Sequence, residues 1–177
     1  MIKINQNISL QPITKKDCEI LYSLMKEIYP PAYSHFWNDE GGWYVKSQYS
    51  ELNVLKELSE EKAAYYFVLF KNEIIGNFRV VWDNKLKDLS GKQVKLHRLY
   101  LHPKTQGNGI GKQLLYWLEE KSKKEGYSII WLDAMNEQPQ AFQFYKKQGY
   151  IYHSHCFLDF KLLKNEVRKM SQLYKKI

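Results

Sequence analysis

The feature that most constrains the fold is a glycine-rich stretch, Gln106 to Lys112, which reads Gln-Gly-Asn-Gly-Ile-Gly-Lys. Residues 94–101 before it are rich in branched and aromatic side chains, a composition typical of a strand. After it, leucines recur at helical spacing up to Leu118. Glycines at a strand-to-helix junction leave backbone N–H groups uncovered at the positive end of the helix, where phosphate oxygens can accept hydrogen bonds. The stretch therefore predicts a pyrophosphate site.

The spacing argues against two common phosphate-binding loops. The loop of nucleoside-triphosphate enzymes needs Gly-x-x-x-x-Gly-Lys followed by Ser or Thr, whereas Gln106 and Gln113 occupy the first and last of these positions. A dinucleotide fingerprint needs Gly-x-Gly-x-x-Gly, and the glycines at 107, 109 and 111 close one residue early. Asp133 falls near the position of the ribose-binding acid of such a site, so this interpretation remains a minor alternative.

A third pattern, Gln/Arg-x-x-Gly-x-Gly/Ala, is satisfied by Gln106, Gly109 and Gly111. With the segments 96–103 and 141–150 in the same order around it, residues 94–150 resemble the acetyl-CoA-binding region of the GNAT superfamily of N-acetyltransferases. The resemblance implies an α/β (α+β) fold with a mixed, twisted sheet flanked by helices, in which the central parallel strands splay apart. It also implies direct transfer of an acetyl group from acetyl-CoA to an amine, which could belong to a small molecule, a polyamine, an amino acid or a protein.

The resemblance assigns roles to individual residues. Backbone groups at 99–101 pair with the coenzyme arm and polarise the thioester carbonyl, and backbone N–H groups at 107–112 take the pyrophosphate, with the Gln106 side chain bracing the loop. The family commonly has Asn where Gln138 stands, and Asn136 lies two residues earlier, so either amide could meet the coenzyme. The coenzyme-binding residues implied are Leu99, Tyr100, Leu101, Gln106, Gly107, Asn108, Gly109, Ile110, Gly111, Lys112, Asn136, Gln138 and Tyr145.

Tyr145 matches the family tyrosine that protonates the departing thiolate. A phenol with a pKa of about 10 is a workable proton donor to a thiolate whose conjugate thiol has a pKa of about 8.5. The alternative is a core tyrosine on an aromatic helix face.

Many family members carry Glu at the start of the strand before the loop, where it acts through water as the general base. Lys95 stands here instead, and a lysinium cannot take the proton of an alkyl amine. His97, two residues on and on the same strand face, is the first substitute, followed by Asp133, Asp39 and Glu40. His97 could equally be a packed or surface histidine. Lys95 also supports an alternative function, a non-catalytic acyl-CoA-binding regulatory module.

Residues 32–45 form an aromatic and acidic stretch predicted to be a loop. Its acids could receive a cationic acceptor, or its rings could pack over the sheet while the acids face water. The candidate acceptor-binding residues are Tyr33, Trp37, Asp39, Glu40 and Asp133. His153, His155 and Cys156 invite a metal interpretation, but they lack a second cluster of ligands, so no metal is expected.

Length, composition and charge limit the number of domains, the type of partner and the cellular location. A chain of 177 residues that is 44% hydrophobic fits one domain over residues 1–177. The net charge of +8 suits an anionic partner such as coenzyme A, but the basic residues are scattered and no nucleic-acid-binding motif accompanies them. No secretory leader, membrane-length apolar run or Cys-x-x-Cys motif occurs, so a cytoplasmic protein is expected. The oligomeric state is open, a homodimer included.

The patterns predict an order of secondary-structure elements. Pro30-Pro31 should stop a first helix begun after Thr14, Ser47 should cap a second, and Lys71-Asn72 should turn a hairpin. The last segment, 167–177, has a spacing closer to a helix, but the family places a strand there and we follow it. Strands are expected over 8–13, 63–70, 73–82, 94–101, 127–133 and 150–160, and helices over 14–29, 48–58, 110–125 and 139–148.

Overall fold

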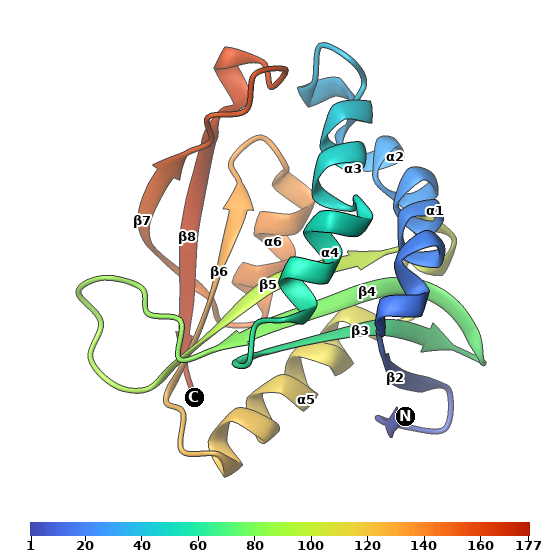
Figure 1. Ribbon diagram of the computed structural model, residues 1–177. Coiled ribbons are helices and arrows are strands. Elements are labelled where there is room, and N and C mark those ends of the chain that lie inside the picture. The colour runs from blue at the N-terminus through green and yellow to red at the C-terminus, as the bar shows by residue number, and fades with distance from the viewer.

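The computed structural model describes residues 1–177, whose strands form one eight-stranded sheet in the order β1-β2-β3-β4-β5-β6-β8-β7 (Figure 1). Neighbouring strands are antiparallel except β5 and β6, which are parallel. The strands are β1 (Ile2–Lys3), β2 (Ile8–Pro12), β3 (Ala63–Phe70), β4 (Glu73–Trp82), β5 (Gln93–Leu101), β6 (Ile129–Met135), β7 (Ile151–Phe157) and β8 (Lys169–Lys176).

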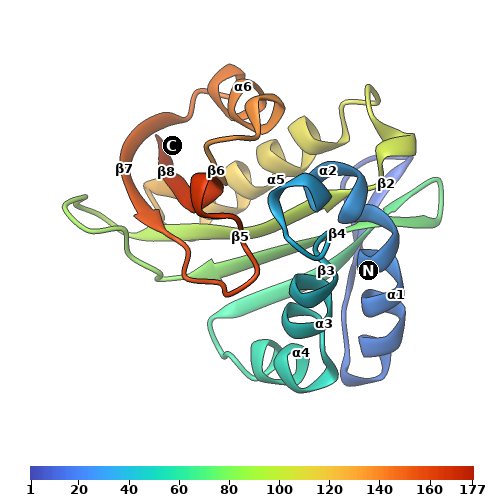
Figure 2. The ribbon, with the colours of Figure 1, turned by 90° about the horizontal axis from the view of Figure 1, so that it is seen from above.

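Helices cover both faces of this sheet, as the view from above shows (Figure 2). One face carries α1 to α4 over an 18-residue apolar cluster, and the other carries α5 and α6 over a 17-residue cluster. Successive side chains of β3 point to opposite faces of the sheet, so Phe67 packs in the first cluster and Val68 in the second. The helices are α1 (Cys18–Ile28), α2 (Pro30–Tyr33), α3 (Gly42–Gln48), α4 (Glu51–Leu58), α5 (Ile110–Lys124) and α6 (Pro139–Lys147), with 3₁₀ turns at Lys15–Asp17, Ser34–Phe36, Pro103–Thr105 and Asn165–Val167.

Two predictions that depended on local signals are confirmed, and so is one that came from the family resemblance. Lys71 and Asn72 turn the β3–β4 hairpin with φ of 51° and 67°, as the tightest hairpin turns require. Thr14 and Asp17 form a reciprocal cap ahead of α1. Residues 169–176 form a strand, β8, so the strand expected from the family resemblance replaces the helix suggested by the spacing.

Two boundary predictions are wrong. Residues 32–45 are not one loop, because α2, a 3₁₀ turn and the start of α3 fall within them. The prediction that Pro30-Pro31 stops the first helix is confirmed, but Pro30 also begins α2, since proline lacks an N–H that a first helical turn would leave unpaired. Ser50, not Ser47, caps α4 by accepting the Asn53 N–H at 3.3 Å.

The parallel strands β5 and β6 pair only at their beginnings. Pairing runs from Gln93 with Ile129 to Leu96 with Leu132, yet β5 continues to Leu101 and β6 to Met135. On its other edge β5 contains a bulge, because Arg79 pairs with Arg98 and Val80 with Leu96, which leaves His97 as the extra residue. A bulge bends its strand, so β5 turns away from β6 at His97.

None of the helices combines the length with the apolar character that crossing a bilayer would need.

Candidate active site

A cleft of about 980 Å³ lies where β5 and β6 diverge. Its walls come from β5 and β6, the glycine loop and α6 on one side, and α2 and α3 with the chain that follows β7 on the other. Elements that are distant in the sequence therefore meet around the uncovered end of β5.

The uncovered edge of β5 presents two backbone amides to this cleft. The His102 N–H donates to the Ile75 oxygen at 2.7 Å, which directs His102 toward β4. Backbone groups of an antiparallel strand alternate between its two edges, so Tyr100 also faces β4 while Leu99 and Leu101 face the gap. Of the three residues predicted to pair with the coenzyme arm, these two have suitable amides. Tyr100 contributes its ring, whose hydroxyl lies 3.3 Å from the Tyr44 hydroxyl.

The glycine loop is open on the side that a phosphate would occupy. Gly107 and Gly109 have φ of +85° and +68°, and a Cβ added at either would meet no atom within 4 Å. The N–H of Gln113 is the first in α5 to reach a helical acceptor, the Gly109 oxygen at 3.2 Å, so the N–H groups of residues 110–112 have no intrahelical partner. Free amides, open space and the positive end of a 15-residue helix fit a pyrophosphate.

The loop is braced by neighbours other than the predicted Gln106. Thr105 Oγ1 donates to the His102 oxygen at 2.8 Å, and Asn108 Nδ2 donates to the Thr105 oxygen at 3.0 Å. Gln106 lies on the cleft wall and its side chain makes no hydrogen bond within the protein, whereas Asn108 points into the loop and does not line the cleft. Gly111 serves packing, because a Cβ there would lie 3.0 Å from the Phe144 ring.

Tyr145, on α6, lines the cleft. Burial raises the pKa of Tyr145 above its usual value, and the nearby Tyr33 adds to the shift. The Tyr145 phenol is therefore protonated at neutral pH and makes no hydrogen bond within the protein. Its ring is held edge-on by Phe144 and Tyr150 at centroid distances of 5.1 and 5.7 Å. The side chain is thus a fixed, protonated donor on the cleft wall.

The two candidate amides near the start of α6 differ in their positions. Gln138 stands immediately before α6, lines the cleft and donates through Nε2 to the Ala32 oxygen of α2 at 2.9 Å. The Asn136 Oδ1 instead accepts from Ser171 Oγ at 2.7 Å, and Asn136 does not line the cleft. Gln138 is therefore the one of the two that faces the cleft.

Lys95, which replaces the usual Glu, is paired with a second predicted residue. Its Nζ lies 2.6 Å from Asp133 Oδ2 on β6, and it lies over the Trp131 ring at 4.3 Å. The other carboxylate oxygen of Asp133 accepts from Gln172 Nε2 at 3.2 Å. Both Lys95 and Asp133 line the cleft. The cleft therefore holds a Lys95–Asp133 ion pair at the position of the usual Glu, and not an isolated positive charge.

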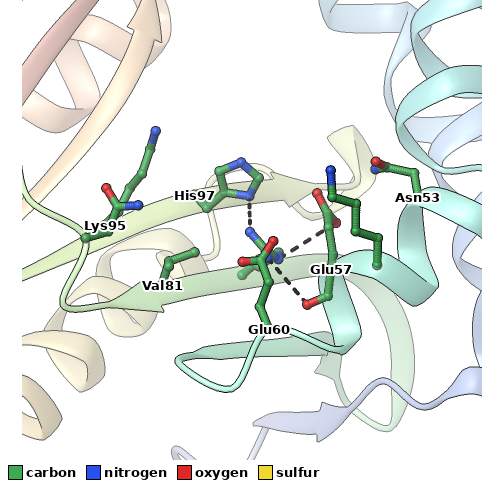
Figure 3. Close-up of a pocket in the computed structure, with 9 residues that line it drawn as sticks. Asn53, Glu57, Glu60, Val81, Lys95 and His97 are labelled. Carbon is green, nitrogen blue, oxygen red and sulfur yellow. Dashed lines mark hydrogen bonds and ion pairs between the residues drawn. The ribbon is translucent and has the colours of Figure 1, made fainter.

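His97 lies on the bulge and lines the cleft. One of its ring nitrogens already makes a hydrogen bond (Figure 3). Arg79 Nη1 lies 2.7 Å from His97 Nδ1, and because a guanidinium can only donate, Nδ1 is the acceptor. Desolvation, together with the charges of Arg98, Arg79 and Lys95, lowers the pKa of His97 below its usual value, although the side chain keeps some contact with solvent. The imidazole is therefore neutral with its proton on Nε2, which makes it a hydrogen-bond donor toward the cleft. The general-base role predicted for His97 gains no support from this arrangement.

The aromatic and the acidic parts of residues 32–45 separate in space. Tyr33 and Trp37 line the cleft, and an isolated backbone bridge joins Trp37 to Leu163 in the β7–β8 connection. Asp39 instead holds the start of α3 by accepting the Trp43 N–H at 2.5 Å and the Gly41 N–H at 3.3 Å. Glu40 is exposed outside the cleft. Neither of these two predicted acceptor-binding acids lines the cleft, because Asp39 caps a helix and Glu40 faces solvent.

The histidines of β7 have other partners. His153 Nε2 lies 2.8 Å from the Lys87 oxygen, and His155 Nδ1 lies 2.9 Å from the Tyr152 hydroxyl. No three His, Cys, Asp or Glu side chains are grouped as metal ligands would be.

Comparisons with known proteins bear on this geometry. The sequence profile of the acetyltransferase (GNAT) family matches residues 22–150, which hold the glycine loop, the diverging strands and Tyr145. The chain belongs to this family. It is therefore an acetyl-CoA-dependent N-acetyltransferase, and the fold and the coenzyme expected from the sequence are confirmed.

Relatives in the GNAT family resemble the chain over most of their length. A spermidine N(1)-acetyltransferase of Thermoplasma acidophilum is 26% identical over 146 residues, covering 81% of this chain and 88% of the relative. An uncharacterized N-acetyltransferase of Lactobacillus delbrueckii subsp. lactis is 21% identical over 154 residues, covering 85% and 89%. The crystal structure of the PaiA N-acetyltransferase of Thermoplasma acidophilum with coenzyme A superimposes with a TM-score of 0.71 at 21% identity, covering 97% of this chain and 100% of that one.

Proposed function

We propose that this acetyltransferase acetylates the primary amine of a small molecule in the cleft between β5 and β6, with Tyr145 as the proton donor. The supporting observation is that one cleft holds three features acetyl transfer requires. These are the open amides at the start of α5, the Leu99 and Leu101 amides on the uncovered edge of β5, and the protonated phenol of Tyr145.

In the proposed reaction acetyl-CoA supplies the acetyl group as a thioester. The amine nitrogen forms a bond to the carbonyl carbon, the carbon–sulfur bond breaks, and the sulfur takes the proton of Tyr145. The proton that the amine loses passes to solvent water, and a proton from solvent restores the Tyr145 phenol. The Leu99 or Leu101 N–H would donate to the carbonyl oxygen, a type of interaction whose removal costs about 3–4 kcal/mol in other enzymes. The amides of residues 110–112 and the Gln138 side chain would hold the coenzyme.

The first test is thiol release from acetyl-CoA with a panel of primary amines that includes spermidine, comparing the wild type with Tyr145→Phe. Because a positioned acid contributes about 10²- to 10⁴-fold in rate, kcat should fall by about that factor. Coenzyme A binding, measured by calorimetry, should stay within about threefold, since the ring and its edge-on contacts remain. Tyr116→Phe is the matched control, because Tyr116 lies 64% exposed on α5 and should affect neither quantity.

Unchanged turnover in Tyr145→Phe would refute the role given to this phenol. Tight coenzyme binding with no turnover on polyamines, amino acids, arylamines or peptides would instead favour the regulatory acyl-CoA-binding module, for which Lys95 at the usual Glu position is the supporting feature.

A further inference from the structure

A second, polar pocket of about 260 Å³ opens beside the cleft (Figure 3). Residues of α4, β4 and β5 form it, and Val81 is the one apolar side chain among the nine that line it. Lys95 and His97 line both this pocket and the cleft, so the two spaces meet at these side chains. A molecule whose amine lies in the cleft can extend a polar group past them.

Every carboxylate along this path is already paired with a cation of the protein. Glu57 Oε1 lies 2.7 Å from Arg98 Nη2, and Glu60 Oε2 lies 2.6 Å from Arg79 Nη2. Asp133, the only acid that lines the cleft itself, is held by Lys95 at 2.6 Å. Glu57 Oε2 makes no hydrogen bond, but it too lies near a cation, 3.7 Å from Arg79 Nε. A polycationic acceptor would thus find no carboxylate here without a cation of the protein beside it, in spite of the spermidine relative.

Hydrogen-bond donors, in contrast, remain free at the junction. An ammonium group has three N–H donors, and Asp133 is the one hydrogen-bonding or ion-pair partner of Lys95. The Nε2–H of His97 points away from Arg79 and makes no hydrogen bond within the protein (Figure 3). Lys56, which lines the polar pocket, has no ion-pair partner either. Three positions on one path therefore offer donors that a bound acceptor could use.

We propose that the amine acetylated by this protein carries a carboxylate, and that Lys95 Nζ and His97 Nε2–H bind that carboxylate. The proposal rests on the function proposed above. Leu99 lies two residues beyond His97, or about 7 Å along the strand. A carboxylate at the junction would therefore be separated from the reacting nitrogen by several carbon atoms, as in an ω-amino acid or the side-chain amine of a diamino acid. An α-amino group, one carbon from its carboxylate, would fall short.

The test compares two acceptors that differ in the carboxylate, 6-aminohexanoate and hexylamine. For the wild type, kcat/KM should favour 6-aminohexanoate by about 10- to 100-fold, the factor expected for charge-assisted hydrogen bonds. Lys95→Met should remove most of this preference by lowering kcat/KM for 6-aminohexanoate much more than kcat/KM for hexylamine. Because that change leaves Asp133 unpaired, Lys95→Met/Asp133→Asn provides a second variant without the stranded charge. Lys175→Met is the matched control, since it breaks an ion pair with Glu119, also 2.6 Å long, that lines neither space.

A binding measurement separates this proposal from the proposed function. Calorimetry with coenzyme A present should show that 6-acetamidohexanoate binds at least about tenfold more tightly than N-hexylacetamide. In His97→Phe the ratio of these two affinities should be smaller. Turnover without a preference for the carboxylate, or a preference retained in both Lys95 variants, would overturn the proposal while leaving the transferase function intact. Binding preference without turnover would support the site and refute the function. Faster turnover of spermidine than of 6-aminohexanoate would also overturn it.

Discussion

Replacing Gly109 tests whether the open loop holds the coenzyme phosphates. Gly109 precedes α5 with φ of +68°, and a side chain placed there would contact no protein atom within 4 Å. Gly109→Ala should therefore lower the free energy of unfolding only through left-handed strain, by about 1–2 kcal/mol. Gly109→Glu carries the same strain, but its negative charge at the positive helix end should raise the free energy of unfolding by about 0.3–1 kcal/mol. The two variants should thus be similarly stable.

Their affinities for coenzyme A should differ widely. A carboxylate at about 4–6 Å from a phosphate, at an effective dielectric constant of about 20, is repelled by about 3–4 kcal/mol. Gly109→Glu should therefore bind coenzyme A at least about 100-fold more weakly than Gly109→Ala. Urea unfolding measures the stabilities, and calorimetric titration measures the affinities at one ionic strength.

Gly126 provides the matched control, since it lies at the other end of α5 with φ of +78° and no atom within 4 Å of an added Cβ. Gly126→Glu should lose stability, because the charge then opposes the negative helix end, yet bind coenzyme A as the wild type does. Equal affinities of Gly109→Ala and Gly109→Glu would refute the phosphate site at this loop.

Two further predictions concern packing and pH. Gly111→Val should lower the free energy of unfolding by about 1–3 kcal/mol through overpacking against Phe144. In urea unfolding, the double variant Gly111→Val/Phe144→Ala should lose less stability than the sum of the losses in Gly111→Val and Phe144→Ala. The lowered pKa of His97 means that below about pH 6.5 the unfolded chain binds a proton that the folded chain does not, so this residue should reduce stability as the pH falls. Between pH 6.5 and 4, the free energy of unfolding should fall less steeply with decreasing pH for His97→Gln than for the wild type. Equal slopes of the free energy of unfolding against pH in the two proteins would contradict the neutral imidazole.

Much of the fold follows from signals within short stretches of sequence. The hairpin at Lys71-Asn72 and the start of α5 at Gly109 need left-handed backbone, which few residue types adopt easily, so the sequence marks them directly. Strand β8 shows the limit of such signals. Its apolar spacing is closer to that of a helix, yet β6 and β7 flank it on both sides and their ladders decide its conformation.

The sequence could also predict that the glycine loop and Tyr145 line one cleft, because both depend on spacing along one chain segment. The electrostatics of the site could not. Asp39 became a helix cap, Asp133 met Lys95 across two diverging strands, and Arg79 fixed the tautomer of His97. Each of these outcomes depends on the register of strands or on a contact between distant segments. The sequence therefore determined the family, the glycine loop and the positions of most helices and strands. Tertiary structure alone decided which charged side chains stay without an ion-pair partner, because ion pairs form between neighbours in space.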